Sequence, residues 1–567
     1  MINRVMSNIS VRLEKNSFKK SIIVNMLIYS LLNLFFEASI KVDDYLINVL
    51  LYGLYDGAPS TINLYINPLM ARILSLLFNM HSFPWFTLLQ VGSCFIALCV
   101  IYYYIEKYNR FIPKSWIIVL LLCISYDFYI KITFTKTAGI TILAGILLTL
   151  LAINELKNMI MVILGIVLAL WGSLFRYDML LFTIGSVVII IFYRLLNEER
   201  KVLFLIKNVI LFLIIIGFGK LLLIEGQQFV KENNDWNEYK EENAVNALLY
   251  NYGQIVFQKY TVDLEEYAIS ENDFELIKRS MLIDSKYYSE ERLTALANKY
   301  SKKNRYTNYG ASIKKAFKVL LEEPLVFVLI PYIIIIMYNC NNNTRLLILV
   351  QICYMIFEIL YMVLRGRTTH HVNVILIVCS VVGILSFTGR RWRELESFHK
   401  GTTIYLIICL LLFFNSYYEN MLLKSYDVSM NDSKSIFYKE YSIENDNRLK
   451  RIAKDSNSIY VIDSNCAKKL YYIFGAYDVP IREEYKNIYF TNIYFFPQQR
   501  GVLKKNNVNN LIVDAVDNDN VRFCMVDEAP YDNLLIDFLE EHYSVSVYTE
   551  ELERVDNIVV FILKTKK

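Results

Sequence analysis

Residues 202–224 read VLFLIKNVILFLIIIGFGKLLLI, and this stretch decides the fold. Its length exceeds the roughly 20 predominantly apolar residues that an α-helix needs to cross the hydrocarbon core of a bilayer. Residues 117–125 and 140–153 are further apolar runs of the same kind. The chain has 567 residues, of which 55% are hydrophobic. These features predict a multi-pass α-helical membrane protein.

The apolar runs repeat along most of the chain, and polar loops separate them. We expect about eleven spans, at residues 21–37, 86–104, 115–130, 137–153, 159–175, 179–196, 204–224, 325–338, 346–364, 372–388 and 402–418. The membrane part, residues 21–424, follows a short N-terminal segment at residues 1–20. It contains two long polar loops, at residues 38–85 and 225–323.

Charge predicts the orientation of these spans. The N-terminal segment and every second loop after it are basic, through Arg4, Arg12, Lys15, Lys19, Lys20, Lys107, Arg110, Lys114, Arg194, Arg200, Lys201, Arg390, Arg391 and Arg393. Because cytoplasmic loops carry the excess of Lys and Arg, we expect a cytoplasmic N-terminus. An odd number of spans then places the two long loops and the tail, residues 425–567, outside. The Asn, Ile and Lys content is typical of a low-GC bacterium, which favours the plasma membrane.

The tail has the pattern of a small extracytoplasmic α/β domain. We expect strands at residues 458–462, 510–513, 521–526, 545–548 and 558–563, and helices at residues 466–474 and 534–542. Cys466 and Cys524 are the only two cysteines of the tail, as two buried thiols or as one disulfide. The tail has no Gly-rich phosphate loop, so a nucleotide site is not expected there.

Two adjacent carboxylates, Asp43 and Asp44, follow the first span. Acidic side chains beside lipid are costly unless they do chemistry, bind a metal or have partners. Apolar residues then recur at helical spacing, and a second amphipathic run at residues 69–78 follows Pro68, which suits the first turn of a helix. Both segments are typical of short helices that lie in the membrane interface. The alternative is that the acidic pair only caps the first of these helices.

Cations occur in the short outer loops, where the insertion bias disfavours them. They are Lys131, Lys136, Arg176, Arg365, Arg367, His370 and His371. A phosphate or pyrophosphate lipid headgroup explains them, because Arg and Lys pair strongly with phosphate.

Each of these cations also has a structural explanation. Arg176 can pair with Asp178 at a helix end, and the two lysines can extend to lipid phosphates. Asp127, near the outer end of the third span, can pair with Lys131 four residues on. His370 and His371 lack the further ligands of a zinc site.

The acidic pair, the following helices and the Asn67-Pro68-Leu69 turn resemble the GT-C superfamily of membrane glycosyltransferases. The resemblance covers this loop, the multi-span layout and the outer tail. It implies a polyprenyl-phosphate-linked sugar donor, a glycan, lipid or teichoic-type acceptor, and a loop carboxylate as general base. Asp43 or Asp44 would be that base, although the commonest family forms are Asp-Glu or Asp-x-Asp. Tyr45, Asn48, Asn67 and Asp178 are further candidates for the site.

Other functions stay open. A polysaccharide polymerase or ligase acting on polyprenyl-linked glycans would share the outer cations, but would depend on arginines of the large loop. A transporter or flippase would show paired halves or spans broken by Gly or Pro, and the sequence shows no such repeat. A net charge of +4 is too small to indicate a nucleic acid partner. No cofactor is firmly indicated, and a divalent metal stays open, since one Asp pair is a thin metal site.

Overall fold

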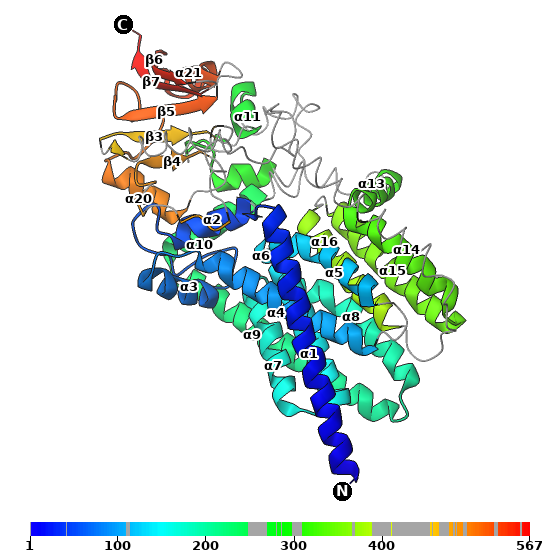
Figure 1. Ribbon diagram of the computed structural model, residues 1–567. Coiled ribbons are helices and arrows are strands. Elements are labelled where there is room, and N and C mark those ends of the chain that lie inside the picture. Colours follow the sequence, from blue (N-terminus) through cyan, green and yellow to red (C-terminus); the bar gives the residue numbers. More distant parts are fainter. Residues whose placement is uncertain are drawn as a thin grey trace.

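The computed structural model is a helical bundle with a small mixed sheet at one end (Figure 1). It describes residues 2–40, 42–108, 114–247, 269–278, 281–284, 286–296, 309–365, 369–387 and 410, and much of residues 454–566. In the tail, the gaps are residues 456, 464–465, 467–475, 480–481, 484, 492–495, 527–530 and 556–557.

The membrane part consists of helices joined by short turns. Its long helices are α1 (Ile2–Phe35), α4 (Trp85–Tyr108), α5 (Lys114–Tyr129), α6 (Phe134–Leu151), α7 (Met159–Phe175), α8 (Asp178–Asn197), α9 (Lys201–Lys231), α14 (Pro324–Asn339), α15 (Asn342–Leu364) and α16 (His370–Ser386). Among the described residues, six helices are long and apolar enough to cross a membrane, or up to seven if the bent pair α13–α14 counts as one. The chain is therefore a membrane protein.

Ten of the predicted spans coincide with these helices, and the eleventh, residues 402–418, lies outside the described residues. The count of eleven spans is not confirmed. Helices α5, α7, α14 and α16 have 16 or 17 residues, slightly fewer than the roughly 20 that a perpendicular span needs. The N-terminal segment is also helical, because α1 begins at Ile2. Helix α9 continues to Lys231, so the large loop begins later than residue 225.

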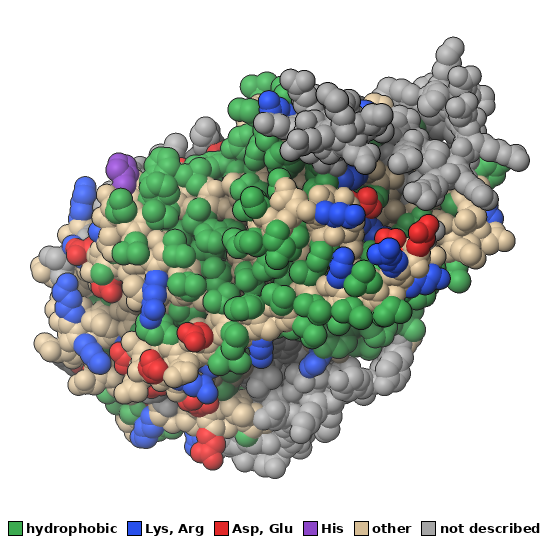
Figure 2. Space-filling model, turned by 90° about the horizontal axis from the view of Figure 1, so that it is seen from below, with side chains coloured by type: hydrophobic (Ala, Val, Ile, Leu, Met, Phe, Trp, Pro, Cys, Tyr) green, Lys and Arg blue, Asp and Glu red, His purple; other side chains and the backbone are tan. Residues whose placement is uncertain are grey.

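Helix α6 forms the centre of the bundle, and 89% of its apolar 18-residue stretch is buried. It packs closely on α7, because Gly145 faces Ala169 and Gly165 faces Thr149. Helices α1 and α9 are at the periphery, because only 22% and 28% of their apolar 18-residue stretches are buried. Figure 2 shows hydrophobic side chains over the middle of one face, with charged residues toward its margins. Exposed apolar faces of this kind are what lipid requires.

The first outer loop contains the two expected short helices, α2 (Val42–Leu51) and α3 (Pro68–Met80). Helix α3 begins as predicted: Pro68 occupies the first turn, and the Asn67 side chain accepts the N–H of Leu69 at 2.9 Å. Helix α2 differs from the expectation of a half-exposed interfacial helix. Its residues 44–51 are all buried, because other parts of the protein cover them.

Just before α2, strand β1 (Ser39–Ile40) pairs in parallel with β2 (Lys131–Ile132), which lies between α5 and α6. The end of α1 and the beginning of α6 are thereby joined at one end of the bundle (Figure 1). This pairing places the acidic pair beside the turn that carries Lys131 and Lys136.

The tail forms a five-stranded sheet in the order β4-β3-β5-β7-β6. Its elements are β3 (Ile459–Ile462), β4 (Ile488–Phe490), α20 (Pro497–Lys505), β5 (Val521–Val526), α21 (Tyr531–Tyr543), β6 (Val547–Val555) and β7 (Ile558–Thr565). Strand β3 is parallel to β4 and β5, whereas β7 is antiparallel to β5 and β6. The expected α/β fold of the tail is therefore present.

Three details of the tail differ from the sequence expectation. Residues 510–513 form turns instead of a strand, because Asp514 accepts the amides of Asn509 and Asn510, and Asn510 accepts those of Ile512 and Val513. Strand β4 and helix α20 were not predicted. Of the expected helix at residues 466–474, only Cys466 lies among the described residues. Its buried thiol is not in a disulfide and lies 3.6 Å from the Cys524 thiol.

The tail rests directly on α2 and the residues that follow it. Tyr485 N–H donates to the Leu54 carbonyl at 2.8 Å, and the Tyr485 and Tyr45 hydroxyls are hydrogen-bonded. Arg482 donates to the carbonyl of Phe78, in the last turn of α3, at 2.7 Å. The large loop also contacts the tail: α10 (Asn234–Asn246) meets α20, and α11 (Glu271–Lys278) meets α21. The tail and both outer loops therefore form one layer at this end of the bundle.

Candidate functional site

Several of the candidate residues converge on the turn between α5 and α6, residues 130–137, which we call the α5–α6 turn. Asp44 accepts a hydrogen bond from Phe134 N at 2.8 Å. Arg176, directly after α7, donates from Nη1 to Thr135 Oγ1 at 2.9 Å. Thr133 caps α6 by accepting the amide of Lys136. Residues that are far apart in sequence are thus collected at one end of the bundle.

Asp44 is a buried carboxylate with an unusual environment. Its side chain is 1% exposed, and Oδ2 has no hydrogen-bond partner among the described residues. Burial raises the pKa of Asp44 to about 8, although the Phe134 amide opposes this shift. Because the bonded amide belongs to α6, Asp44 does not cap its own helix, and the capping explanation does not account for it.

Asp43 occupies a different environment from its neighbour. It is half-buried, whereas Asp44 is enclosed. A general base must come within hydrogen-bond reach of the proton that it removes. The two adjacent carboxylates therefore differ in environment: Asp43 is the more exposed, and Asp44 joins α2 to the α5–α6 turn.

At the α5–α6 turn, four ionisable side chains form a largely buried network, in which His370 is the most exposed at 28%. Lys136 Nζ lies 3.3 Å from Asp127 Oδ1, and both side chains are almost fully buried. His370 Nε2 lies 3.0 Å from the same Asp127 oxygen. On the other side of the ring, His370 Nδ1 lies 2.7 Å from Glu323 Oε2. Asn373 donates to Glu323 Oε1 at 3.2 Å.

Both ring nitrogens of His370 face carboxylate oxygens, one of Asp127 and one of Glu323. Each contact needs one hydrogen, which the ring nitrogen or the carboxyl group can carry. The ring therefore bridges the two acids, and Asp127 is also paired with Lys136. Buried charges are tolerated when they are paired and hydrogen-bonded in this way.

The network changes the interpretation of Lys136 and His370, which were predicted to bind the donor phosphate. Lys136 is 1% exposed, so it does not extend to lipid phosphates, and its ammonium group is held against Asp127. Both ring nitrogens of His370 are in contact with carboxylates, so neither is available to a phosphate. Both residues are better described as supports of the site than as ligands of a donor.

Two more accessible cations are Lys131, in the α5–α6 turn, and Arg176, which follows α7 and contacts the turn through Thr135. Lys131 is half-buried, with Nζ 5.8 Å from the centre of the Tyr126 ring. Arg176 is 22% exposed, and its Nε lies 4.0 Å from Asp178 Oδ2. Asp178 itself is 69% exposed, so this pairing is a weak constraint. Both cations therefore remain suitable for an anionic headgroup.

The other basic candidates contribute less to this arrangement. Arg365, at the end of α15, donates from Nε to the Tyr361 hydroxyl at 3.2 Å, one turn back on its own helix. His371 is half-buried beside His370. Arg367 lies outside the described residues.

The further candidates of the first loop have mostly structural positions. Asn67 is occupied by its cap of α3 and by a 2.8 Å hydrogen bond to the Leu222 carbonyl of α9. Tyr45 contacts Tyr485 of the tail. Asn48 is buried, and its Oδ1 has no partner among the described residues.

Sequence reasoning missed Glu323, Asn373 and Gln90, and gave Asp127 only a minor role. Gln90 lies beside Asp44, and its Oε1 is 3.4 Å from the Thr137 hydroxyl. One signal was present: Glu323 directly precedes Pro324 at the beginning of an apolar run. The rule that flagged Asp43 and Asp44, an acidic residue at the end of a span, applies equally to Glu323 and Asp127.

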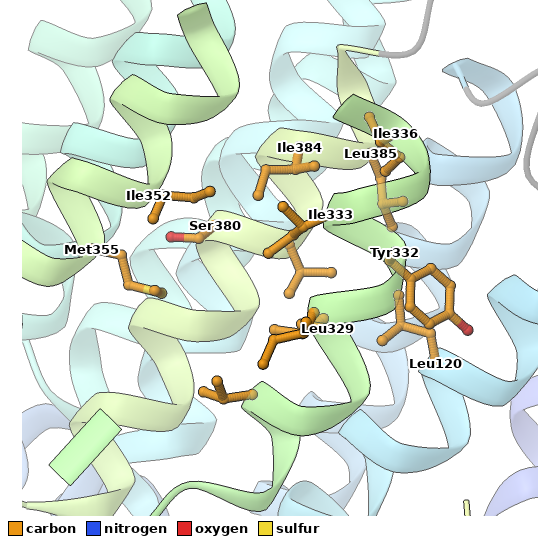
Figure 3. A pocket seen from close by; sticks show the side chains of 13 residues that line it. Leu120, Leu329, Tyr332, Ile333, Ile336, Ile352, Met355, Ser380, Ile384 and Leu385 are labelled. Carbon is orange, nitrogen blue, oxygen red and sulfur yellow. The ribbon is translucent and has the colours of Figure 1, made fainter. Parts of the chain in front are cut away.

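A small cavity lies between α5, α14, α15 and α16 (Figure 3). Its volume is ≈ 50 Å³, and its walls are apolar apart from Tyr332 and Ser380. The Tyr332 hydroxyl donates to the Trp116 carbonyl at 2.8 Å. The cavity suits a hydrocarbon segment, and it offers no acid or base for catalysis.

One group of three metal-ligating side chains occurs within the described part of the chain. It consists of Asp273 in α11 and Glu541 and His542 in α21, whose ligand atoms lie within 4.8 Å of one another. His542 Nε2 donates to Asp273 Oδ1 at 2.8 Å, which already explains the proximity of these two residues. The group lies at the junction of the large loop and the tail, in different elements from the acidic pair.

Comparison with known proteins identifies no relative. No protein-family model, no curated protein and no solved structure matches this chain.

Proposed function

We propose that this membrane protein is a glycosyltransferase that moves a sugar from a polyprenyl-phosphate donor to an acceptor of the cell envelope. In this proposal, the end of the bundle that carries the acidic pair and the tail faces outward. The acceptor is a glycan, a lipid or a teichoic-type polymer. The protein would belong to the GT-C group, with the reaction at the surface of the plasma membrane.

The observation that carries the proposal is the convergence at the α5–α6 turn. A sugar transfer needs a base for the acceptor hydroxyl and cations for the leaving phosphate. Asp43 is a half-buried carboxylate that adjoins this turn through Asp44, and Lys131 and Arg176 are its accessible cations. We assign Asp43 as the base, and Lys131 with Arg176 as the binding group for the donor phosphate.

The neighbouring residues then have supporting roles. Asp44 holds α2 against α6, so that the base is kept in register with the cations. The buried network of Asp127, Lys136, His370 and Glu323 fixes α5, α6 and α16 relative to one another. Such supports matter because a displacement of about 1 Å can lower a rate by about 100-fold.

The direct test is sugar transfer in proteoliposomes that contain synthetic polyprenyl-phosphate sugars. We expect Asp43→Asn to lower turnover by about 100-fold or more while donor binding is retained, because loss of a general base typically costs 10²–10⁴-fold. Arg176→Ala should instead weaken donor binding. Glu37→Gln is the matched control, since it alters an exposed carboxylate between α1 and the acidic pair, and it should change little.

Two results would change the assignment. If Asp43→Asn turns over normally and Asp44→Asn does not, then the buried carboxylate is the base. If both variants transfer sugar at the wild-type rate, the acidic pair is structural. Elongation of polyprenyl-linked glycans, or their translocation, would then be the reaction to measure.

A further inference from the structure

Helix α13 (Tyr309–Leu321) lies at one end of α14 and α15 and packs against both (Figure 1). Its packed side includes Ala316, which is 4% exposed, with Val319 and Leu320 partly buried. The rest of its surface faces away from the protein. This outward surface has two distinct sectors.

The first sector is an apolar stripe. Ile313, Phe317 and Leu321 follow one another at intervals of four residues, so they lie on one face of the helix. Their side chains are 46%, 48% and 53% exposed. Three large apolar side chains in a row on the outside of a helix indicate a surface that is covered in the working protein.

The second sector is basic. Lys314, Lys315 and Lys318 are all exposed and lie next to the apolar stripe. Helix α13 contains no acidic residue. Lys318 approaches Glu322 at 3.7 Å, but both side chains are largely exposed, so this ion pair holds the lysine weakly.

The direction of α13 relates these sectors to the membrane. Helices α13 and α14 meet at a bend of 79°. Helix α14 is strongly apolar, and its position matches one of the predicted spans. If α14 crosses the bilayer, a helix bent by 79° from it runs nearly parallel to the membrane surface.

We infer that α13 is an in-plane helix that binds the headgroups of anionic phospholipids. Its apolar stripe enters the acyl region, and its lysines extend to the phosphates on the same side. Basic residues at this level are attracted by an anionic leaflet. A second copy of the chain does not suit this face, because the three lysines beside the stripe would repel their counterparts. The inference does not depend on the reaction proposed above.

The first test compares the lysines of α13 in lipid nanodiscs of two compositions, phosphatidylcholine alone and a mixture with phosphatidylglycerol. The full chain is treated with an amine-acylating reagent, and modification is followed by mass spectrometry. We expect Lys314, Lys315 and Lys318 to react about fivefold more slowly in the anionic discs. Lys504 and Lys505, exposed at the end of α20, should react equally in both. High salt should abolish the difference. Equal rates for the α13 lysines in both discs would overturn the inference.

The second test concerns the apolar stripe. Exposed apolar residues in water tolerate serine, whereas residues inserted in lipid do not. We therefore expect Ile313→Ser with Phe317→Ser to lower the midpoint temperature of unfolding in nanodiscs. Tyr548→Ser with Leu552→Ser is the matched control, because these tail residues are 44% and 45% exposed. Equal midpoints for the two double variants would contradict insertion of α13. A loss that occurs only when two copies share one disc would also contradict it, and would indicate self-association.

Discussion

Asp44 links stability to pH at the scale of a single residue. Burial raises the pKa of this carboxyl to about 8, whereas the pKa of Asp in an unfolded chain is about 3.9. Between these values, the folded state binds more protons than the unfolded state. The free energy of unfolding should therefore fall as the pH rises from about 4 to about 8, by at most roughly 1.4 kcal/mol per pH unit from this group.

Replacement of Asp44 removes this dependence. We expect Asp44→Asn to be increasingly stable relative to wild type as the pH rises through this window, since Asn stays neutral and still accepts the Phe134 amide. Chemical unfolding in detergent at several pH values measures the difference. Asp178→Asn is the control, because Asp178 is exposed. Parallel pH profiles for wild type and Asp44→Asn would show that Asp44 ionises as readily in the folded chain as in the unfolded one.

His370 is the residue on which the buried network depends. Without this ring, Glu323 loses its 2.7 Å contact to Nδ1, and Asp127 loses its 3.0 Å contact to Nε2. We expect His370→Gln to reduce the free energy of unfolding by about 1–3 kcal/mol, the usual cost of leaving a buried polar group without its hydrogen bond. Thermal unfolding in nanodiscs measures this loss. His81→Gln, an exposed histidine, should stay within about 0.5 kcal/mol of wild type.

A double variant separates the charge effect from packing. When Glu323→Gln is added to His370→Gln, the double variant lacks the Glu323 carboxylate as well as its His370 partner. The Lys136–Asp127 pair remains. Part of the lost stability should return. An additive loss would mean that the two side chains contribute by shape alone.

At the scale of elements, the contact between α6 and α7 depends on small residues. A Cβ atom at Gly165 would lie 2.3 Å from Thr149 Oγ1 and 2.8 Å from the Gly145 carbonyl oxygen. We expect Gly165→Ala to destabilise the protein by about 1–3 kcal/mol through overpacking. In α9, a Cβ at Gly217 would meet nothing within 4 Å, so Gly217→Ala should be neutral or slightly stabilising. The midpoint temperature of unfolding distinguishes the two variants. Equal midpoints would mean that α6 and α7 can move apart to accommodate the added methyl group without loss of stability.

The positions of the helices could be predicted from sequence, but their number as spans could not. Apolar runs mark helices well, because a backbone in lipid must satisfy its own hydrogen bonds. Length is less informative: α5 and α16 have only 16 and 17 residues, and α5 ends beside a turn that the bundle itself encloses. Likewise, residues 510–513 have a strand-like composition, but the side chains of Asn510 and Asp514 bind the local amides and favour turns.

At the scale of the whole molecule, the tail and α2 form a common interface. Tyr485 is 1% exposed and contacts Tyr45, Leu54 and Tyr55 of the first loop. We expect Tyr485→Ala to cost about 3–5 kcal/mol, the range for large aromatic-to-alanine changes, and to loosen α2. Hydrogen exchange of the α2 amides should accelerate. The exposed tail variant Tyr548→Ala should leave this exchange unchanged, and unchanged exchange in Tyr485→Ala would show that the tail does not stabilise α2.

The sequence predicted which residues carry charge at the end of the bundle beside the tail, because the insertion rules make such residues conspicuous. It did not predict which of these charged residues pair with one another. Lys136 and His370 were expected to face a ligand, yet both are directed at Asp127. That choice depends on how α5, α6 and α16 are packed, and helical spacing within one element contains no information about packing between elements.

The covering of α2 by the tail has a consequence for synthesis. More than 400 residues separate α2 from the tail residues that enclose it, as the contact of Tyr45 with Tyr485 illustrates. At the usual elongation rate of about 5–20 residues per second, the ribosome needs roughly 20–90 seconds to span that distance. During this interval, α2 is made but not enclosed. A nascent chain therefore completes its outer layer only near termination, and a prematurely stopped chain presents an uncovered α2 to quality-control proteases.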